Sequence, residues 1–293
     1  MALLLAGAVV AYTDHDAAET LGFLGIVVGQ FVAGTLVFRR SRELQRRERN
    51  AWRFFGAALF LAATGVLVVG ILTELGIAIP AFGWTDIFFL SGYAMLFVTF
   101  IRLARADGGG TDWLPTLIDA LMGGLALAVL VWTNFFQDLL HSFDDAALWE
   151  LAIAAAYPIM DIAAAVGLMI LIIRRSNFHM DVRLTFLAIG ISTQVVADFI
   201  FFSSGVGKTF AEAEPQFGLL LVATACYLMV GALVDRVPNK REFPEQAAPI
   251  WAVVWPYLLV AGLVTAHISS FISLSPTSNE VLLLSASLLI GVI

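Results

Sequence analysis

Residues 54–78, FFGAALFLAATGVLVVGILTELGIA, contain one charged side chain, Glu74. A helix needs about 20 mostly apolar residues to cross a bilayer, because lipid offers its backbone no hydrogen-bond partners. The whole chain of 293 residues is similar, with 60% hydrophobic and 13% charged residues, whereas soluble domains are about 25% charged. The sequence therefore predicts an all-α, polytopic transmembrane helical bundle. It excludes a disordered chain, a disulfide scaffold and a basic nucleic-acid binder.

Apolar stretches of this kind recur along the chain. Seven more reach the length of a span: 20–38, 84–103, 114–136, 150–173, 184–203, 217–234 and 250–268. Two shorter apolar segments, 1–12 and 281–293, lie at the ends. We expect the first to be a short or tilted helix and the second to be a helix cut off partway. Because the internal loops are short, residues 1–293 are predicted to form one membrane domain of about ten spans.

The basic residues predict the orientation, because cytoplasmic loops carry an excess of Lys and Arg. Of the 16 Lys and Arg residues, 15 fall in alternate loops, and only Lys208 lies on the other side. The loops of that other side carry acidic residues instead, for example Asp14, Asp144 and Glu212. If one span had been overlooked or wrongly added, the basic and acidic loops would no longer alternate. The prediction is a multi-pass protein with both termini cytoplasmic.

The loop after the second predicted span is rich in arginine. Its spacing is partly helical, since Arg42 and Arg46, and Arg49 and Arg53, are four residues apart. Two interpretations are open: contact with anionic lipid headgroups, or contact with a cytoplasmic output domain. The residues concerned are Arg39, Arg40, Arg42, Arg46, Arg47, Arg49 and Arg53.

Five carboxyl groups lie within or at the edges of predicted spans, where a charge is costly. They are Glu74, Asp86, Asp119, Asp161 and Asp198. The sequence places no Lys or Arg at a matching depth. Each carboxyl is therefore expected to be protonated, to be hydrogen-bonded to polar neighbours, or to face water or a bound cation.

Polar neighbours accompany two of these aspartates. Tyr157 and Asp161 are four residues apart and share a helix face, as do Gln194 and Asp198. Pro158 removes a backbone donor between the first pair, which predicts a polar notch in that helix. Ordinary hydrogen bonding between helices explains such residues, and Asp119, Pro158 and Glu74 are assigned to this structural role.

Two functional interpretations of the same carboxyls remain open. One is a ligand-binding pocket that opens outward, and the other is a pathway for protons or cations. The residues expected to line the pocket are Asp86, Tyr157, Asp161, Gln194 and Asp198.

No motif indicates catalysis, a cofactor or a metal site. The segment GVGKT at 205–209 resembles a phosphate-binding loop, but Phe202 stands where the first glycine is needed. The four histidines are expected in loops or at span edges, whereas a haem between spans needs them deeper. Nothing forms a nucleophile–base pair or a zinc signature. We therefore expect no catalytic residue, no metal and no cofactor.

Four segments in order resemble the multi-span membrane region that precedes GGDEF and EAL domains in bacterial, particularly actinobacterial, cyclic-di-GMP signalling proteins. They are WTDIFFLSGYAM (84–95), LPTLIDALMGGLALAVLVW (114–132), AYPIMDIAAAVGLMIL (156–171) and VVADFIFF (195–202). The positions that match the pattern are Asp86, Asp119, Tyr157, Pro158, Asp161 and Asp198. The resemblance covers about residues 84–235.

This resemblance implies a sensory or anchoring module in the bacterial inner membrane that feeds a diguanylate cyclase or phosphodiesterase. Neither GGDEF nor EAL occurs in the 293 residues, so the chain itself is expected not to be an enzyme. The cytoplasmic output domain is expected to lie beyond Ile293. The implied partners are membrane lipids, a small-molecule ligand, the output domain and a second copy of the chain, with no nucleic acid.

The sequence therefore leaves three functions open. The first is a sensor or anchor module for cyclic-di-GMP signalling, with a small ligand in a polar outer pocket. The second is a proton- or cation-coupled transporter or channel subunit that uses the buried carboxylates. The third is a structural membrane anchor or assembly partner.

Overall fold

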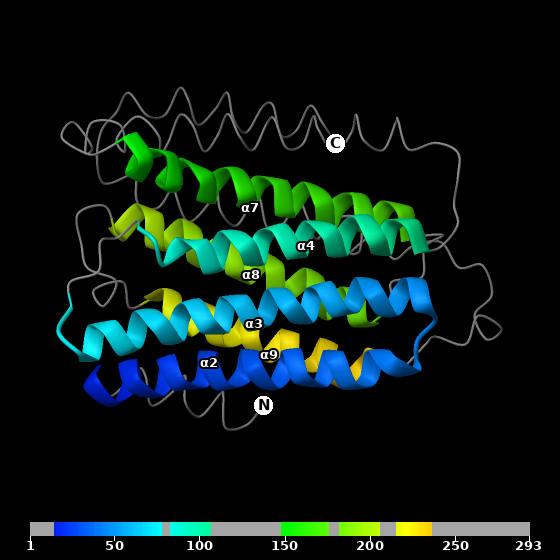
Figure 1. Cartoon of the computed structure of the whole chain (residues 1–293), viewed down its shortest axis with the longest axis horizontal. Helices are drawn as coiled ribbons and strands as arrows, with labels where there is room; N and C mark the ends of the chain where they lie inside the picture. Colours follow the sequence, from blue (N-terminus) through cyan, green and yellow to red (C-terminus); the bar gives the residue numbers. More distant parts are fainter. Residues whose placement is uncertain (1–14, 78–82, 107–147, 176–181, 206–214, 236–293) are drawn as a thin grey trace, which may run out of the picture.

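The computed structural model describes residues 15–77, 83–106, 148–175, 182–205 and 215–235 (Figure 1). This part of the chain is helical and contains no strand. Its elements are α2 (His15–Arg40), η1 (Ser41–Glu43), α3 (Arg46–Glu74), α4 (Asp86–Ala106), α7 (Leu148–Arg175), α8 (Val182–Gly205) and α9 (Pro215–Leu233). The predicted spans 1–12, 114–136, 250–268 and 281–293 lie outside the described residues.

The six long helices of the described part form a closed ring. Helix α2 packs against α3, α3 against α4, α4 against α7, α7 against α8, α8 against α9, and α9 returns to α2. Figure 1 shows these helices running side by side along the length of the bundle. The ring follows chain order, so each helix meets the described helices before and after it in the sequence.

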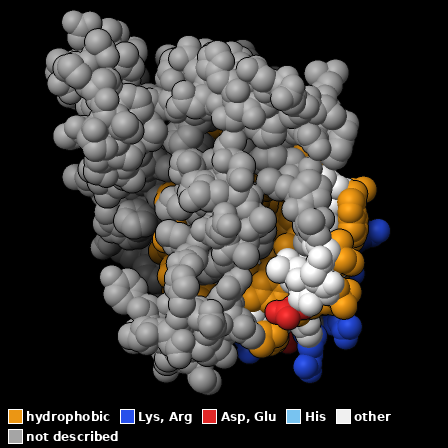
Figure 2. All heavy atoms as spheres, turned by 90° about the vertical axis from the view of Figure 1, so that its left-hand side faces the viewer, with side chains coloured by type: hydrophobic (Ala, Val, Ile, Leu, Met, Phe, Trp, Pro, Cys, Tyr) orange, Lys and Arg blue, Asp and Glu red, His pale blue; other side chains and the backbone are white. Residues whose placement is uncertain are grey.

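Three helical stretches of the described part are long and apolar enough to cross a membrane. They are Gly22–Glu43, Arg46–Glu74 and Asp86–Arg105, and two shorter apolar stretches are Ala156–Leu168 and Gly218–Leu233. Large apolar side chains on the outside suit contact with lipid, since Val28, Ile87 and Ile159 are each more than half exposed. Figure 2 looks at the end where α3 ends and α4 begins, and apolar side chains cover much of the described surface there. The predicted helical membrane class is confirmed; the count of ten spans stays a prediction.

Helix α3 differs from its predicted span at both ends. It begins at Arg46 rather than Phe54, so part of the arginine-rich stretch forms its first turns. It ends at Glu74, because Gly76 adopts a positive φ of 68° that few other residues tolerate. The Gly76 N–H then bonds the Thr73 carbonyl and the Ile77 N–H bonds the Leu72 carbonyl, which is a Schellman ending.

Helix α7 runs without interruption from Leu148 to Arg175, through Pro158. The predicted notch therefore does not break the helix. Pro158 is buried. The polar groups near it are the side chains of Tyr157 and Asp161, which point to other helices as described below.

Small residues allow α2 and α9 to approach closely. A Cβ atom added at Gly231 would lie 2.9 Å from the carbonyl oxygen of Ala33 and 3.0 Å from the Cβ of Leu36. Both neighbours belong to α2, and a backbone carbonyl has little room to move. Glycine at this position therefore sets the distance between the two helices.

Candidate ligand-binding site

The ring of helices surrounds a cavity of about 140 Å³ to which all six contribute side chains. Most of its wall is apolar, with residues such as Ile26, Leu59, Val66 and Val195. Its polar wall consists of Gln30, Thr85, Asp86, Tyr93, Tyr157, Gln194, Asp198 and Tyr227. None of the described residues that line it is Lys or Arg.

Asp86 lies at one edge of this cavity, at the start of α4. The turn before the helix places the Gly83 N–H against one carboxyl oxygen of Asp86. The Tyr157 hydroxyl of α7 donates to the other oxygen. Asp86 is only 6% exposed. Two neutral donors from two segments therefore hold a buried acidic group against the cavity.

Tyr93 lies two turns after Asp86 on α4 and connects α4 to α7 and α8. Seven residues separate it from Asp86, so both lie on the same face of the helix. Its hydroxyl oxygen contacts Asp161 of α7 and lies 2.8 Å from Oδ2 of Asp198 of α8. A phenol carries one proton and donates to one carboxyl at a time. When both contacts are hydrogen bonds, the second proton comes from a carboxyl and the phenol oxygen accepts it.

Gln194 and Tyr227 extend this network to α9. The Tyr227 hydroxyl donates to Oε1 of Gln194 over 2.9 Å, and the Gln194 side chain also hydrogen-bonds Asp198. Gly190 makes room for the tyrosine ring, because a Cβ there would lie 2.6 Å from Cε1 of Tyr227. The chain of contacts thus runs from Asp161 through Tyr93, Asp198 and Gln194 to Tyr227.

Gln30 of α2 belongs to the cavity wall and carries a buried oxygen without a partner in the described part of the chain. Its side chain is 3% exposed, and Oε1 has no hydrogen-bond partner within the described residues. A buried carbonyl oxygen without a donor costs about 1–3 kcal/mol. The carboxyl groups, the three tyrosine hydroxyls and Gln194 all have hydrogen-bond partners, so this acceptor requires a separate explanation.

The structure brings together four of the five residues assigned to a pocket. Asp86, Tyr157, Gln194 and Asp198 line the cavity. Asp161 is 1% exposed and contacts Tyr93, which itself lines the cavity, so Asp161 acts on the site through that tyrosine.

The residues assigned to a structural role lie elsewhere. Pro158 is buried within α7, and Glu74 is exposed at the end of α3. Neither of them lines the cavity. Asp119 lies outside the described residues.

One of the two pairs expected within a single helix is present, since the Gln194 side chain hydrogen-bonds Asp198. Tyr157 bonds Asp86 on another helix, although Asp161 is its neighbour four residues away. A tyrosine is long enough to reach across a helix interface, so the interhelical bond is available to it. Four polar residues of the site were missed: Gln30, Thr85, Tyr93 and Tyr227. Tyr93 could have been found from its seven-residue spacing to Asp86, and Gln30 as a lone amide in an apolar span.

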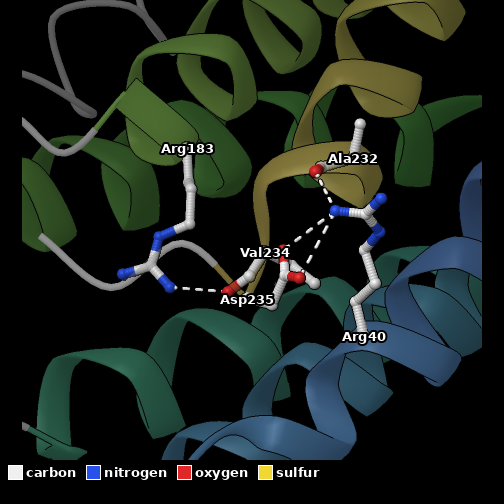
Figure 3. Close-up of polar contacts among 5 residues, drawn as sticks. All are labelled: Arg40, Arg183, Ala232, Val234 and Asp235. Atoms are coloured by element: carbon white, nitrogen blue, oxygen red, sulfur yellow. Dashed lines mark hydrogen bonds and ion pairs between the residues drawn. The ribbon is translucent and has the colours of Figure 1, made fainter.

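A second polar cluster lies at the opposite end of α4, away from Asp86, and we call it the arginine cap (Figure 3). It consists of Arg40, Arg183, Ala232, Val234 and Asp235, together with Glu48 of α3. Nη1 of Arg40 donates to the Ala232 carbonyl over 2.6 Å and lies 3.1 Å from Oδ1 of Asp235. Nη1 of Arg183 donates to the Val234 carbonyl over 2.8 Å and lies 3.2 Å from Oε1 of Glu48. The two arginines thus satisfy carbonyls at the end of α9 that no helical turn can reach.

The remaining arginines of the predicted cluster lie in the last turn of α2, in η1 and in the first turns of α3. Arg39, Arg42, Arg46 and Arg47 are exposed, and Arg49 and Arg53 are half-buried. Arg46 and Arg47 line an open groove together with Arg102 and Arg105 from the last turns of α4. The predicted cluster therefore divides: Arg40 holds α9, while others form a basic surface.

Comparisons with protein-family models, with curated proteins and with solved structures find no match to this chain. The resemblance to membrane regions of cyclic-di-GMP signalling proteins stays a prediction. Fold and site geometry alone define the class: a helical membrane protein with an acidic, aromatic cavity at the centre of its helix ring.

Proposed function

We propose that the chain is a membrane-embedded sensor module whose central cavity binds a small molecule. The observation that carries this proposal is the cavity itself, to which six helices contribute and whose polar residues converge from α2, α4, α7, α8 and α9. Binding sites are typically apolar cavities with a few convergent polar groups, often between the helices of a bundle. A ligand that touches all six helices can favour one packing of the ring over another through its difference in affinity.

The signal would leave at the arginine cap. Arg40 and Arg183 tie the end of α9 to α2, α3 and α8, so a shift of α9 changes this end of the bundle. We propose that this end faces the cytoplasm of a bacterium, with the protein in the inner membrane, about ten spans and both termini cytoplasmic. The excess of Lys and Arg in the same loops supports that orientation.

The resemblance supports a cyclic-di-GMP synthesis or breakdown domain as the output, while the chain itself acts as the input module. The groove of Arg46, Arg47, Arg102 and Arg105 offers a surface for anionic lipid headgroups or for that domain. Its arginines are suited to phosphate oxygens, because each guanidinium presents a planar fork of donors.

The test fills the cavity and measures the output in cells. Ala62 lines the cavity on α3, so Ala62→Leu at the native locus would place extra carbon atoms inside it. We expect cellular cyclic-di-GMP to become fixed at one level, independent of growth conditions that change it in the wild type. The control is Ala94→Leu on the exposed face of α4, which should behave like the wild type. A response in Ala62→Leu equal to that of the wild type, with normal protein amounts, would contradict a sensor.

A second function is favoured by one observation, the continuous chain Asp161, Tyr93, Asp198, Gln194 and Tyr227. Buried carboxyls in series are typical of proton and cation pathways. Proteoliposomes with a trapped pH-sensitive dye and an imposed Na⁺ or K⁺ gradient test this alternative. Flux that disappears in Asp161→Asn would favour transport over sensing.

A further inference from the structure

We infer that the cavity takes a small organic cation, an amine whose apolar body is about the size of a benzene ring. This inference rests on the proposed binding function and specifies the chemistry of the ligand. Four features of the wall carry it: its charge, its aromatic rings, its unpaired acceptor and its volume.

The described residues of the cavity wall include acidic side chains and no basic ones. Asp86 and Asp198 line the cavity from α4 and α8, and Asp161 lies behind Tyr93. The described lining residues include no Lys or Arg, and within the described residues these carboxyls contact hydroxyls, an amide side chain and a backbone N–H. Buried acidic groups with neutral partners attract a cation and repel an anion.

Aromatic rings and apolar side chains decide which kind of cation fits. Phe55, Phe89, Tyr93, Tyr157 and Tyr227 all line the cavity. Aromatic rings attract ammonium groups through their faces, and an organic body gains by displacing water from apolar walls. A bare metal ion would leave this surface unused. Within the described residues, no group of three or more His, Cys, Asp or Glu side chains is placed to hold one.

Gln30 indicates that the ligand carries a hydrogen-bond donor. Gln30 is among the residues that line the cavity, and its buried Oε1 has no partner in the described part of the chain. An ammonium group carries up to three N–H donors, so it can serve this oxygen and a carboxyl together. The apolar part of the ligand then faces residues such as Leu59 and Val66.

The volume limits the size of the ligand. The cavity measures about 140 Å³. An engineered apolar cavity of about 150 Å³ in another protein binds benzene. An amine of roughly six to eight non-hydrogen atoms therefore fits, whereas a nucleotide or a lipid does not.

The experiment compares three probes that share a phenyl ring and differ in charge, on the full chain in detergent at neutral pH. Benzylamine is the cation, benzyl alcohol its neutral counterpart and benzoate its anionic one. We expect benzylamine to raise the melting temperature and to bind at least about tenfold more tightly than benzyl alcohol, since it adds a charge-assisted contact. Benzoate is expected to have no effect.

Two variants locate the binding site, and Glu74→Gln at the exposed end of α3 serves as control. Asp198→Asn should weaken benzylamine about tenfold and leave benzyl alcohol unchanged. Gln30→Met should weaken benzylamine several-fold but leave the melting temperature of the unliganded protein equal or higher, because it removes an unsatisfied buried oxygen. The second variant breaks no hydrogen bond of Oε1, so it remains informative if Asp198→Asn fails to fold.

Two results would overturn the inference. Benzyl alcohol binding as tightly as benzylamine, with both losing affinity in Ala62→Leu, would show that the cavity binds small molecules without preference for a cation. The sensor proposal would then stand. If neither probe binds, the organic cation is wrong, and the cellular response of Ala62→Leu decides separately whether the sensor proposal is also wrong.

Discussion

The arginine cap and the acidic cavity place charged groups inside the same bundle in opposite ways. In the cap, Arg183 faces Glu48 at 3.2 Å and Arg40 faces Asp235 at 3.1 Å, so charges of opposite sign meet. In the cavity, Asp86 and Asp198 have one sign and neutral partners. The arginine cap has a clear structural role, because its arginines hydrogen-bond the carbonyls at the end of α9. Within the described residues no basic side chain meets the carboxyls of the cavity, and the proposal of a cationic ligand is based on this difference.

Removing Arg183 should have the largest effect on stability, because its side chain is 3% exposed and serves two partners. Arg183→Met leaves the Val234 carbonyl and the Glu48 carboxylate without this donor. Breaking a buried ion pair by removing one partner costs about 3–5 kcal/mol. We expect a large fall in the melting temperature in detergent, and a partial recovery in Arg183→Met with Glu48→Gln.

The control for this variant is Arg42→Met in η1, whose side chain is exposed. It should melt like the wild type. Equal melting temperatures for Arg183→Met and Arg42→Met would show that the cap does not hold α9, and the contrast with the cavity would disappear.

Tyr93→Phe tests the cavity side of the comparison. The variant removes the hydroxyl that joins Asp161 and Asp198, and hydrogen bonds to charged groups contribute about 1.5–3 kcal/mol. We expect a destabilisation in that range, smaller than that of Arg183→Met. The measurement is the melting temperature or the unfolding free energy in the same detergent.

Tyr227→Phe is the matched control, since its hydroxyl donates to the neutral amide of Gln194. A neutral hydrogen bond contributes about 0.5–1.5 kcal/mol, so this variant should lose less than Tyr93→Phe. Equal losses of stability would mean that the hydrogen bonds of Tyr93 to the carboxyls contribute no more than the neutral hydrogen bond of Tyr227.

Gly231→Ala asks whether backbone packing, rather than the arginine cap, positions α9. The new Cβ would lie 2.9 Å from the Ala33 carbonyl oxygen, which forces α2 and α9 apart. Overpacking of this kind costs about 1–3 kcal/mol. Gly218→Ala in the same helix has nothing within 4 Å of its Cβ and serves as control in a melting experiment. A loss in Gly231→Ala that exceeds that of Arg183→Met would make packing the main restraint on α9.

The sequence predicts the helices far better than their partners. Hydropathy places the spans 150–173 and 184–203 within two residues of the ends of α7 and α8. It misses the start of α3, because Arg46 and the residues after it are polar and still helical. Helix formation there depends on spacing and packing rather than on apolar character.

The candidate site is predictable only in part, for a physical reason. The cost of burying a charge marks Asp86, Asp161 and Asp198 as exceptional from the sequence alone. The partner of each carboxyl depends on the rotation of each helix against its neighbours, which a single sequence does not specify. Tyr157 therefore bonds Asp86 on another helix, and Tyr93 was missed altogether, whereas Gln194 and Asp198 on one helix hydrogen-bond each other as their spacing predicts.

Asp235→Asn should have the smallest effect on stability. It measures how much the charge of Asp235 contributes to the stability of the arginine cap. The Arg40 side chain is 40% exposed, so water screens its pair with Asp235. Exposed ion pairs contribute about 0.2–1 kcal/mol, and the Asn variant keeps a hydrogen-bond acceptor and the contact of Arg40 with the Ala232 carbonyl. We expect a change of at most about 0.5 kcal/mol, and less still at high salt. Arg40→Met should cost more, because it also removes the donor to Ala232. If Asp235→Asn costs as much as Arg40→Met, charge pairing dominates this side of the cap, and the carbonyls of α9 contribute little to its stability.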